Sequence, residues 1–478
     1  MKTIFLFEWK KLIRTPFNIL LLLFYISLGI YSIHYGNSVT KKQMLAIHDL
    51  ENLYEEQVKT TIGYFNADTT ITENKTSYHK AIQPIWIEHL VKPVATFRPN
   101  SFSSMAIGYR DVLPFYKEIS TTDNSLHIYQ TDISNPEILA AGNFDLSFVI
   151  IYLIPLLIIV FCHNIISEEK EQGTYTILKL QSNHLRKVLS YKLLFRFLLI
   201  IILTCILNTI AIYSAPSSTP VAILDFLCWQ FVAICYLFFW FVICYVLISF
   251  QKNSVVTSLY MTGTWLLLSI IIPSLFIFYI DVLYPIGIKA DMASEKRKIK
   301  ESVWNLEPKV LIKKFRDHHP EYGLENPNDT LKYSAKHFVA YYEELENQLA
   351  PIAKIHKDKA NKRKKLISRL SEFVPTLKVQ KTLNQIGSTD FKSYTYVEES
   401  TFSFQEKWKK FIYHFIFNDK HVQVKDYLTM PKYALGNLQK PYKEILISVV
   451  ELILLTLILI FLQRYLTLKP NKHLKFKK

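Results

Sequence analysis

The stretch FLCWQFVAICYLFFWFVICYVLISF at residues 226–250 decides the fold, because its 25 residues include no charged side chain. As an α-helix it would be about 37 Å long, enough to cross the roughly 30 Å hydrocarbon layer of a bilayer. Outward from it, similar apolar blocks occupy residues 17–33, 146–162, 197–213, 259–280 and 445–462. The sequence therefore predicts an all-α integral membrane protein with six transmembrane helices.

The composition excludes several other classes of protein. Half of the 478 residues are hydrophobic and 20% are charged. A soluble protein of this length would have to bury six such helices in one core, and secreted, fibrous and disordered chains lack such blocks. All five cysteines lie within the blocks, so the segments between them hold no disulfide and need apolar cores of their own. These are Cys162, Cys205, Cys228, Cys235 and Cys244.

The distribution of basic residues predicts the orientation, because Lys and Arg mark the cytoplasmic flanks of membrane helices. They gather before the first block, after the second and after the sixth, whereas residues 214–225 contain none. Both termini are therefore expected in the cytoplasm. Topology accounts for much of the net charge of +16, and nucleic-acid binding is not expected.

We divide the chain accordingly. The expected parts are an interfacial helix (1–16), a first membrane helix (17–35), a first extracytoplasmic segment (36–145), a second membrane helix (146–166), a cytoplasmic loop (167–194), three more membrane helices (195–214, 224–250 and 257–283), a second extracytoplasmic segment (284–444), the sixth membrane helix (445–466) and a basic tail (467–478).

Both extracytoplasmic segments are expected to be mainly helical. Residues 39–58 form a polar amphipathic run that would prolong the first membrane helix outward. From Phe338 onward apolar residues recur at helical spacing, and Pro351 within that stripe predicts a kink or a division into two helices. Strand-like alternation is weak, although residues 127–130 could pair locally.

A basic run at residues 354–369 has Asp358 as its only acid. It is either the solvated face of a long helix or a surface that contacts anionic headgroups or an acidic partner. Within the membrane helices, Pro155 and Pro273 are either functional kinks or static bends.

Searches for catalytic and metal motifs find none. No two of the 11 glycines are five residues apart, so the chain lacks the P-loop that cradles nucleotide phosphates, and we expect no enzyme activity. The small cluster of His318, His319 and Glu321 is better explained as a helix end than as a metal site. Glu451 is the one acid inside an apolar block, either a functional polar site or a residue that snorkels to the outer interface.

Two segments on the expected cytoplasmic side are more informative. FLFEWKKLIR at residues 5–14 has an apolar helix face and charged sides, which predicts a helix lying on the inner leaflet and stopped by Pro16. The apolar face holds Phe5, Trp9 and Leu12, and the charged sides hold Glu8, Lys11 and Arg14. After the second block, an acidic turn at residues 167–172 ends at Gly173, where a left-handed cap is expected before a short amphipathic helix over residues 175–189.

These segments resemble a known family. FEWKKLIRTP (7–16) is similar to the connecting helix of type-two ABC exporter membrane subunits, and EKEQGTYTILKLQS (169–182) is similar to their E-x-x-G-T coupling helix. Three outer stretches resemble a subgroup with large extracytoplasmic insertions: NPEILAAGNFDLSF (135–148), FRDHHPEYG (315–323) and PTLKVQKTLNQIGSTDFKSY (375–394). Better-known members carry only short re-entrant helices before the last span, where this chain has about 160 residues.

The resemblance implies a permease of the bacterial inner membrane that couples ATP hydrolysis by a separate cytoplasmic ATPase to export of a substrate. ATP and magnesium would be bound by that ATPase, no cofactor by this chain, and a second permease subunit and membrane lipid would complete the assembly. An alternative is a subunit that transports nothing and transmits motion to its outer domains. The implied ATPase-coupling residues are Glu168, Glu169, Gly173, Thr174, Tyr175 and Leu178, and the implied connecting-helix residues are Phe5, Glu8, Trp9 and Arg14.

Overall fold

The computed structural model describes residues 2–122, 143–181, 185–216, 220–250, 252–284, 289–322 and 331–468. Residues 127–130 and the basic tail from residue 469 lie outside that part of the chain. Within these described residues, six helices are long and apolar enough to cross a membrane, which confirms the predicted all-α, six-span fold. They are Pro16–Asn66, Leu146–Glu171, Lys187–Ser214, Ile223–Ser249, Ser254–Leu283 and Tyr442–Tyr465.

In the described part of the chain, the elements follow one another as helices with one short strand pair. In chain order they are α1 (Lys2–Arg14), α2 (Pro16–Asn66), α3 (Thr72–Ile82), α4 (Ile87–Leu90), β1 (Val94–Thr96), β2 (Tyr116–Glu118), α6 (Leu146–Phe148), α7 (Ile154–Cys162), α8 (Ser167–Glu171), α9 (Tyr175–Gln181), α10 (Leu185–Ser214), α11 (Ile223–Ser249), α12 (Ser254–Leu266), α13 (Ile272–Leu283), α14 (Lys289–Trp304), α15 (Pro308–His318), α16 (Ala335–Ser371), α17 (Pro375–Gly387), α18 (Phe391–Phe417), α19 (Val424–Leu428) and α20 (Tyr442–Leu468).

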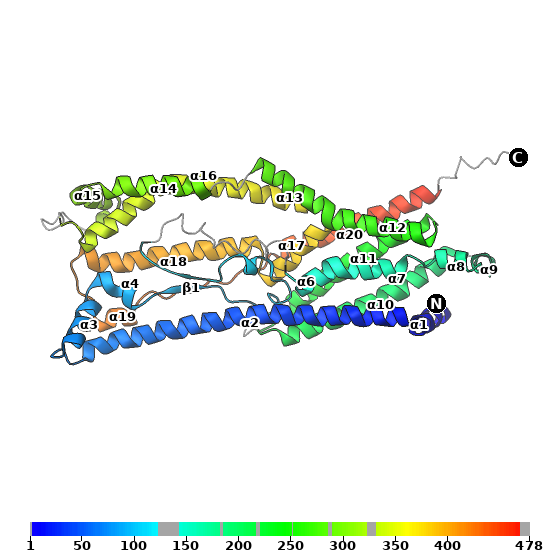
Figure 1. Cartoon of the computed structure of the whole chain (residues 1–478), viewed down its shortest axis with the longest axis horizontal. Helices are drawn as coiled ribbons and strands as arrows, with labels where there is room; N and C mark the ends of the chain where they lie inside the picture. Colours follow the sequence, from blue (N-terminus) through cyan, green and yellow to red (C-terminus); the bar gives the residue numbers. More distant parts are fainter. Residues whose placement is uncertain are drawn as a thin grey trace.

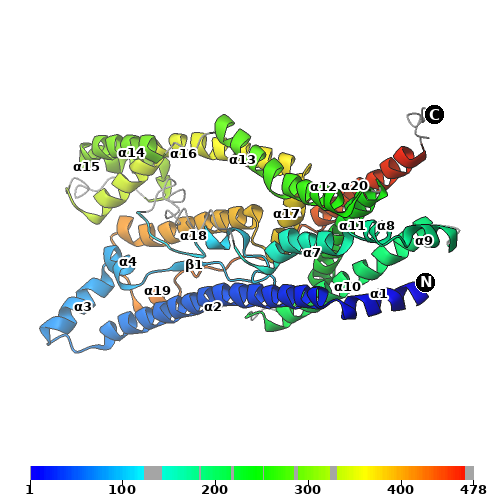
Figure 2. The ribbon, with the colours of Figure 1, turned by 45° about the vertical axis from the view of Figure 1, so that its right-hand side comes forward.

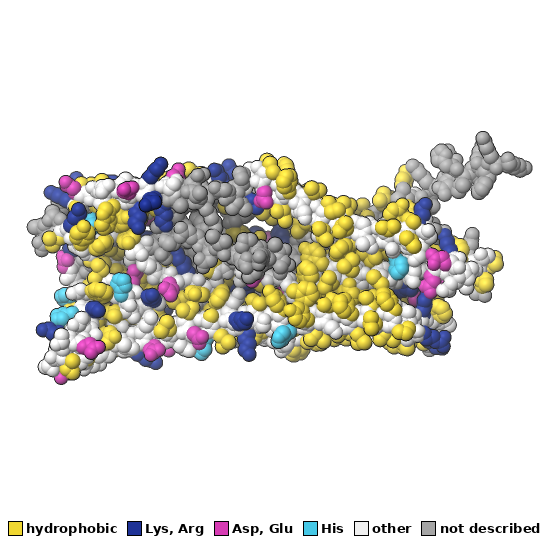
Figure 3. Space-filling model, viewed as in Figure 1, with side chains coloured by type: hydrophobic (Ala, Val, Ile, Leu, Met, Phe, Trp, Pro, Cys, Tyr) yellow, Lys and Arg dark blue, Asp and Glu magenta, His cyan; other side chains and the backbone are white. Residues whose placement is uncertain are grey.

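The molecule is elongated and has two hydrophobic cores (Figure 1). One core lies in the bundle of apolar helices and includes the fully buried Trp229 and Trp240 of α11. The other lies in what we call the distal domain, built from the far half of α2, from α3, α4, α14, α15, α18 and α19, and from the first half of α16; it encloses Trp408. Hydrophobic side chains dominate the surface of the bundle half, whereas charged side chains are scattered over the distal half (Figure 3).

Helix α2 connects the two parts without interruption over 51 residues, which confirms that the polar run at residues 39–58 prolongs the first membrane helix. Its far end reaches α19, where the rings of Phe65 and Tyr427 lie 5.9 Å apart (Figures 1 and 2). Midway, Gly36 packs against the loop after β1, and a Cβ at this position would overlap the carbonyl oxygen of Ser104. The small residue therefore permits the closest approach between α2 and that loop.

Two membrane helices each contain a π-helical turn, next to the prolines for which the sequence predicts kinks or bends. The turns are Val149–Leu153, before Pro155, and Leu267–Ile271, before Pro273. Proline has no amide hydrogen, so a carbonyl one turn earlier loses its helical partner. Tyr236 of α11 satisfies the carbonyl four residues before Pro155, because it donates 2.9 Å to the Ile151 oxygen. Tyr25 of α2 donates to the Leu153 oxygen in the same turn. These irregular turns thus serve as points of attachment between helices.

Helix α16 runs through Pro351 as one helix, so of the two predicted outcomes, a kink or a division, the division does not occur. Its last turns and α17 form a hairpin that enters the bundle, which we call the re-entrant hairpin (residues 363–387). Thr376 near its tip donates 2.9 Å to the carbonyl of Leu268, in the middle of the span Ser254–Leu283. The tip therefore lies at the depth of the middle of a membrane helix.

The strand pair is an element that the sequence did not predict. Val94–Thr96 pairs antiparallel with Tyr116–Glu118, with Ala95 opposite Lys117. Each strand is three residues long, which is too short for an alternating hydrophobic pattern to be visible.

Candidate functional site

The N-terminal helix α1 packs one face onto the bundle and leaves another exposed. Glu8 is 3% exposed and Leu12 is buried, whereas Trp9 is 49% exposed. Phe5 contacts the ring of Phe195 on α10 edge to face at 5.5 Å. Glu8, predicted to lie off the apolar face of this helix, thus points its carboxylate into the protein.

Two cations on α10 surround the Glu8 carboxylate. Arg196 donates to Oε2 at 3.1 Å, and the Lys192 ammonium lies 3.6 Å from Oε1. Both cationic side chains are themselves almost fully buried. Arg196 also donates to the carbonyl of Phe161 near the end of α7, so one guanidinium connects α1, α7 and α10. A carboxylate is tolerated at this depth because positive charge lies on both of its oxygens.

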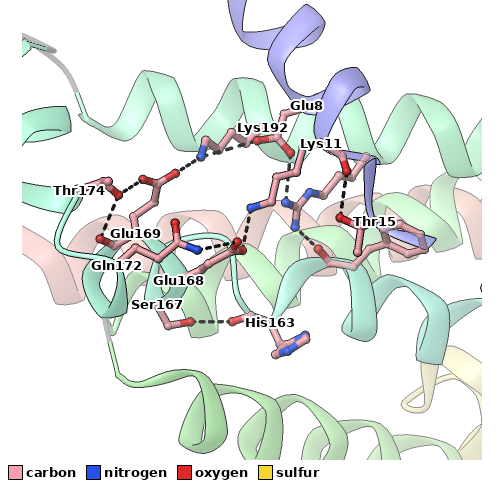
Figure 4. Close-up of polar contacts among 12 residues, drawn as sticks. Glu8, Lys11, Thr15, His163, Ser167, Glu168, Glu169, Gln172, Thr174 and Lys192 are labelled. Atoms are coloured by element: carbon pink, nitrogen blue, oxygen red, sulfur yellow. Dashed lines mark hydrogen bonds and ion pairs between the residues drawn. The ribbon is translucent and has the colours of Figure 1, made fainter. Parts of the chain in front are cut away.

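Ion pairs also connect α1 and α10 to the acidic turn after the second span (Figure 4). Lys192 pairs with Glu169 at 2.7 Å, and Lys11 of α1 pairs with Glu168, also at 2.7 Å. The Thr174 hydroxyl donates to the second oxygen of Glu169. We call Glu8, Lys11, Glu168, Glu169, Lys192 and Arg196 the junction network. Its ion pairs join α1, α8 and α10.

Glu169 forms its contacts within the chain. Its side chain is 16% exposed and is directed toward Lys192 and Thr174 rather than outward. Its neighbour Glu171 accepts 3.3 Å from the backbone amide of Ser254, which ties the turn to the start of α12. The acidic turn is thereby fixed at both ends to membrane helices.

Gly173 ends this turn with a φ of +74°, which confirms the predicted left-handed position. Its amide donates 3.2 Å to the carbonyl of Lys170. A Cβ there would meet no atom within 4 Å, so the backbone conformation and not crowding requires glycine.

Helix α9 follows at the end of the molecule opposite the distal domain (Figures 1 and 2). The predicted helix over residues 175–189 corresponds to α9 and the start of α10, with residues 182–184 outside the described part. Tyr175 is held under the Lys170 ammonium at 5.2 Å. Ile177 and Leu180 are 55% and 79% exposed, although both are large and apolar. The side chain of Leu178 lies outside the described residues.

The structure thus brings together Glu8, Glu168, Glu169 and Thr174, and it leaves Trp9 and Arg14 on the outer surface of α1. Sequence reasoning missed Lys11, Lys192 and Arg196 as network members. Lys192 and Arg196 are four residues apart, and that spacing places both on one helix face. From the sequence alone, Lys192 and Arg196 count only among the basic residues that mark the cytoplasmic flank of the membrane helices.

A cavity of about 190 Å³ opens beside the network, between α1 and the end of α7. Apolar side chains of Phe17, Val160 and Phe195 and the polar groups of Glu8 and Arg196 line it. This arrangement suits a position at the boundary between hydrocarbon and headgroups, where apolar and ionic walls meet.

Glu451 and the histidine cluster have partners within the chain. Lys378 of the re-entrant hairpin pairs closely with Glu451, and Lys381 pairs with Glu372 at 2.8 Å on the same hairpin. His319, at the end of α15, lies 3.3 Å from Glu343. Among the described residues, no group of three or more His, Cys, Asp or Glu side chains is placed to hold a metal ion.

Comparison with known proteins identifies two families along the chain. Residues 291–435 match a domain of unknown function, DUF3526, which covers most of the distal helices and the re-entrant hairpin. No curated protein and no solved structure matches the chain. Residues 2–285 match the ABC-2 family transporter protein, and this match contains the junction network and five of the six spans. Since it covers more than half of the 478 residues, the chain belongs to the ABC-2 family of transporter membrane proteins.

Proposed function

We propose that this permease couples ATP hydrolysis by a separate cytoplasmic ATPase to the export of a substrate across the bacterial inner membrane. Both termini and α9 would then face the cytoplasm, and the distal domain would lie outside. ATP and magnesium would be bound by the partner, and two permease subunits, identical or different, would form the path. The basic residues that flank the spans support this orientation.

The observation that carries the proposal is the way the chain holds α9. An exposed apolar pair, Ile177 and Leu180, stands on a short helix that the acidic turn and the junction network fix to α1, α10 and α12. Large apolar side chains that project beyond the membrane are typical of a surface that binds a partner protein. Because ion pairs join the acidic turn to α1 and α10, and a backbone hydrogen bond joins it to α12, movement of a bound partner would be transmitted to the bundle.

A second candidate function is transmission of motion to the outside without transport. One feature favours it, namely the continuous helix α2, which extends from the end of α1 into the distal domain. In that case the distal domain would act on an envelope partner, and no substrate would be enclosed by the bundle.

The coupling role can be tested by purifying the tagged chain with its ATPase from native membranes. The double variant Ile177→Asp with Leu180→Asp should lose most of the co-purifying ATP hydrolysis, because two charges replace the apolar contact. The control is Ile71→Asp at the far end of the molecule, where the side chain is similarly exposed, at 54%. It should retain wild-type hydrolysis.

Full hydrolysis by the double variant, with normal membrane insertion, would contradict the assignment of α9 as the ATPase contact. Transport and transmission are then separated with inside-out vesicles that hold the intact complex. Export predicts ATP-dependent accumulation of a substrate in the lumen, whereas pure transmission predicts ATP-dependent changes in distal-domain labelling without any accumulation.

A further inference from the structure

The basic run of α16 has a defined position relative to the membrane helices. Arg363 donates 3.0 Å to the carbonyl of Tyr284 and pairs with Asp281 at 2.6 Å. Both partners lie where the span Ser254–Leu283 ends. Arg363 therefore marks the level at which α16 passes through the bilayer surface on the side of the distal domain.

Basic side chains of α16 occur on both sides of that level and point away from the protein. Lys354, Lys362, Lys365 and Arg369 fall within an arc of about 80° around the helix at 100° per residue. We call these four residues the basic collar. All four are exposed, and none forms an ion pair with a residue that the structure describes. Lys357 and Lys359 are also exposed and flank the arc. Figure 3 shows Lys and Arg side chains gathered over α14 and α16.

The chain beyond the collar has the character of a membrane-inserted segment. Ile367 is 39% exposed and Phe373, at the tip of the re-entrant hairpin, is 77% exposed. Since Thr376 next to the tip contacts the middle of a span, these apolar side chains lie at hydrocarbon depth. Lys365 and Arg369 lie about 3 and 9 Å below Arg363 along the helix axis, within the reach of side chains that snorkel to the headgroups.

We propose that the basic collar binds the phosphate groups of anionic phospholipids in the leaflet on the side of the distal domain. Lys362, Lys365 and Arg369 lie within about 9 Å of the level of Arg363 along the helix, where their charges match lipid phosphates, and the apolar tip below them matches the acyl chains. Lys354 continues the same face about 14 Å from that level toward the distal domain. A soluble acidic partner fits this surface less well, because the lower half of the collar lies beneath the bilayer surface. The inference does not depend on ATPase coupling or on export.

The test is local photo-crosslinking in vesicles of equal parts phosphatidylglycerol and phosphatidylcholine. Benzoylphenylalanine replaces Ile367, and the ratio of the two crosslinked lipids is measured for the full chain. Phosphatidylglycerol should be enriched roughly five-fold, which corresponds to one favourable phosphate contact per bound lipid. The enrichment should fall at 1 M salt, where the screening length is about 3 Å.

Two triple variants, each with the same probe at residue 367, separate the collar from net charge. Lys362→Gln, Lys365→Gln and Arg369→Gln together should bring the lipid ratio close to one. The matched control removes three exposed charges in the distal domain, with Lys309→Gln, Lys313→Gln and Lys407→Gln, and should keep the enrichment. Crosslinking to phosphatidylcholine shows that the hairpin of each variant is still inserted.

A ratio near one in the wild type, or the same enrichment in both triple variants, would overturn the proposal. Absence of crosslinks to either lipid together with crosslinks to a soluble protein would overturn it in favour of an acidic partner.

Discussion

The two ends of the molecule hold a carboxylate by opposite means. At the junction, Glu8 lies between the guanidinium of Arg196 and the ammonium of Lys192. In the distal domain, the donors to Glu88 among the described residues are all neutral: the Thr121 amide at 2.7 Å, the Trp408 indole at 2.8 Å, and the hydroxyls of Ser120 and Thr121. The first carboxylate is compensated by charge and the second by dipoles.

This difference determines how each site responds to change. Burial is the main cause that raises the pKa of Glu88, and the hydrogen bonds of its neutral donors offset that effect only in part. Glu88 can therefore be protonated while the side chains around it stay in place. At the junction, each charged side chain pairs with a charged side chain of another helix, so the loss of one cation leaves a buried charge uncompensated. The junction should be sensitive to single substitutions and the distal site to pH.

The largest expected effect is that of Arg196→Leu at the junction. It leaves the buried Glu8 with only the more distant Lys192, and the free energy of unfolding should fall by about 3–5 kcal/mol. Unfolding in mixed micelles measures this change. The double variant Glu8→Leu with Arg196→Leu should recover most of the loss, because an apolar pair replaces the ion pair. If the single variant lost less than about 1 kcal/mol of unfolding free energy, the Glu8–Arg196 pair would contribute no more than a surface ion pair.

An intermediate effect is expected for Lys378→Met in the re-entrant hairpin. Lys378 is almost fully buried, but its partners Glu451 and Glu372 are 41% and 38% exposed. Carboxylates that still reach solvent or headgroups lose less when their cation is removed, so the loss should be about 1–3 kcal/mol. The same unfolding assay applies, and a loss equal to that of Arg196→Leu would show that the degree of burial does not distinguish the two networks.

The smallest effect is a pH dependence at Glu88, with Glu88→Gln as the comparison. Because the pKa of the folded state is raised, the folded protein binds more protons than the unfolded chain as the pH rises above the ordinary value of 4.5. The contribution of Glu88 to stability therefore falls with rising pH through that window. Glutamine does not titrate, so the variant should gain stability relative to the wild type between pH 4 and pH 7. Melting temperatures at several pH values measure this, and a constant difference would contradict the dipole-only description.

The sequence predicted the fold at the level of spans, because each apolar block is long and nearly free of charge. It also predicted the left-handed Gly173, since a glycine at the end of a charged helical turn is a common stop signal. The continuation of α2 followed from an uninterrupted helical pattern. These features depend on residues that are close in the sequence.

The rest depends on residues that are distant in the sequence. The partners of Glu8 are 184 and 188 positions away, so a period of 3.6 residues gave no information on which charges would meet. The insertion of α17 into the bundle was hidden for a similar reason, because Lys378 and Lys381 look like ordinary surface residues until their pairing with Glu451 and Glu372 is known. At Pro351 the sequence left a kink and a division open, and the structure retains one helix, because a long helix can accommodate a proline without division.

Gly36 gives α2 the geometry of a first-class lever. The close packing of Gly36 against the Ser104 carbonyl fixes one point of the rod, and the rod itself is a single helix from Pro16 to Asn66. The arm toward α1 is 20 residues or about 30 Å long, and the arm toward α19 is 30 residues or about 45 Å long. A rigid α2 that pivots at Gly36 would therefore multiply any sideways displacement of α1 by about 1.5 at the tip of the distal domain and reverse its direction.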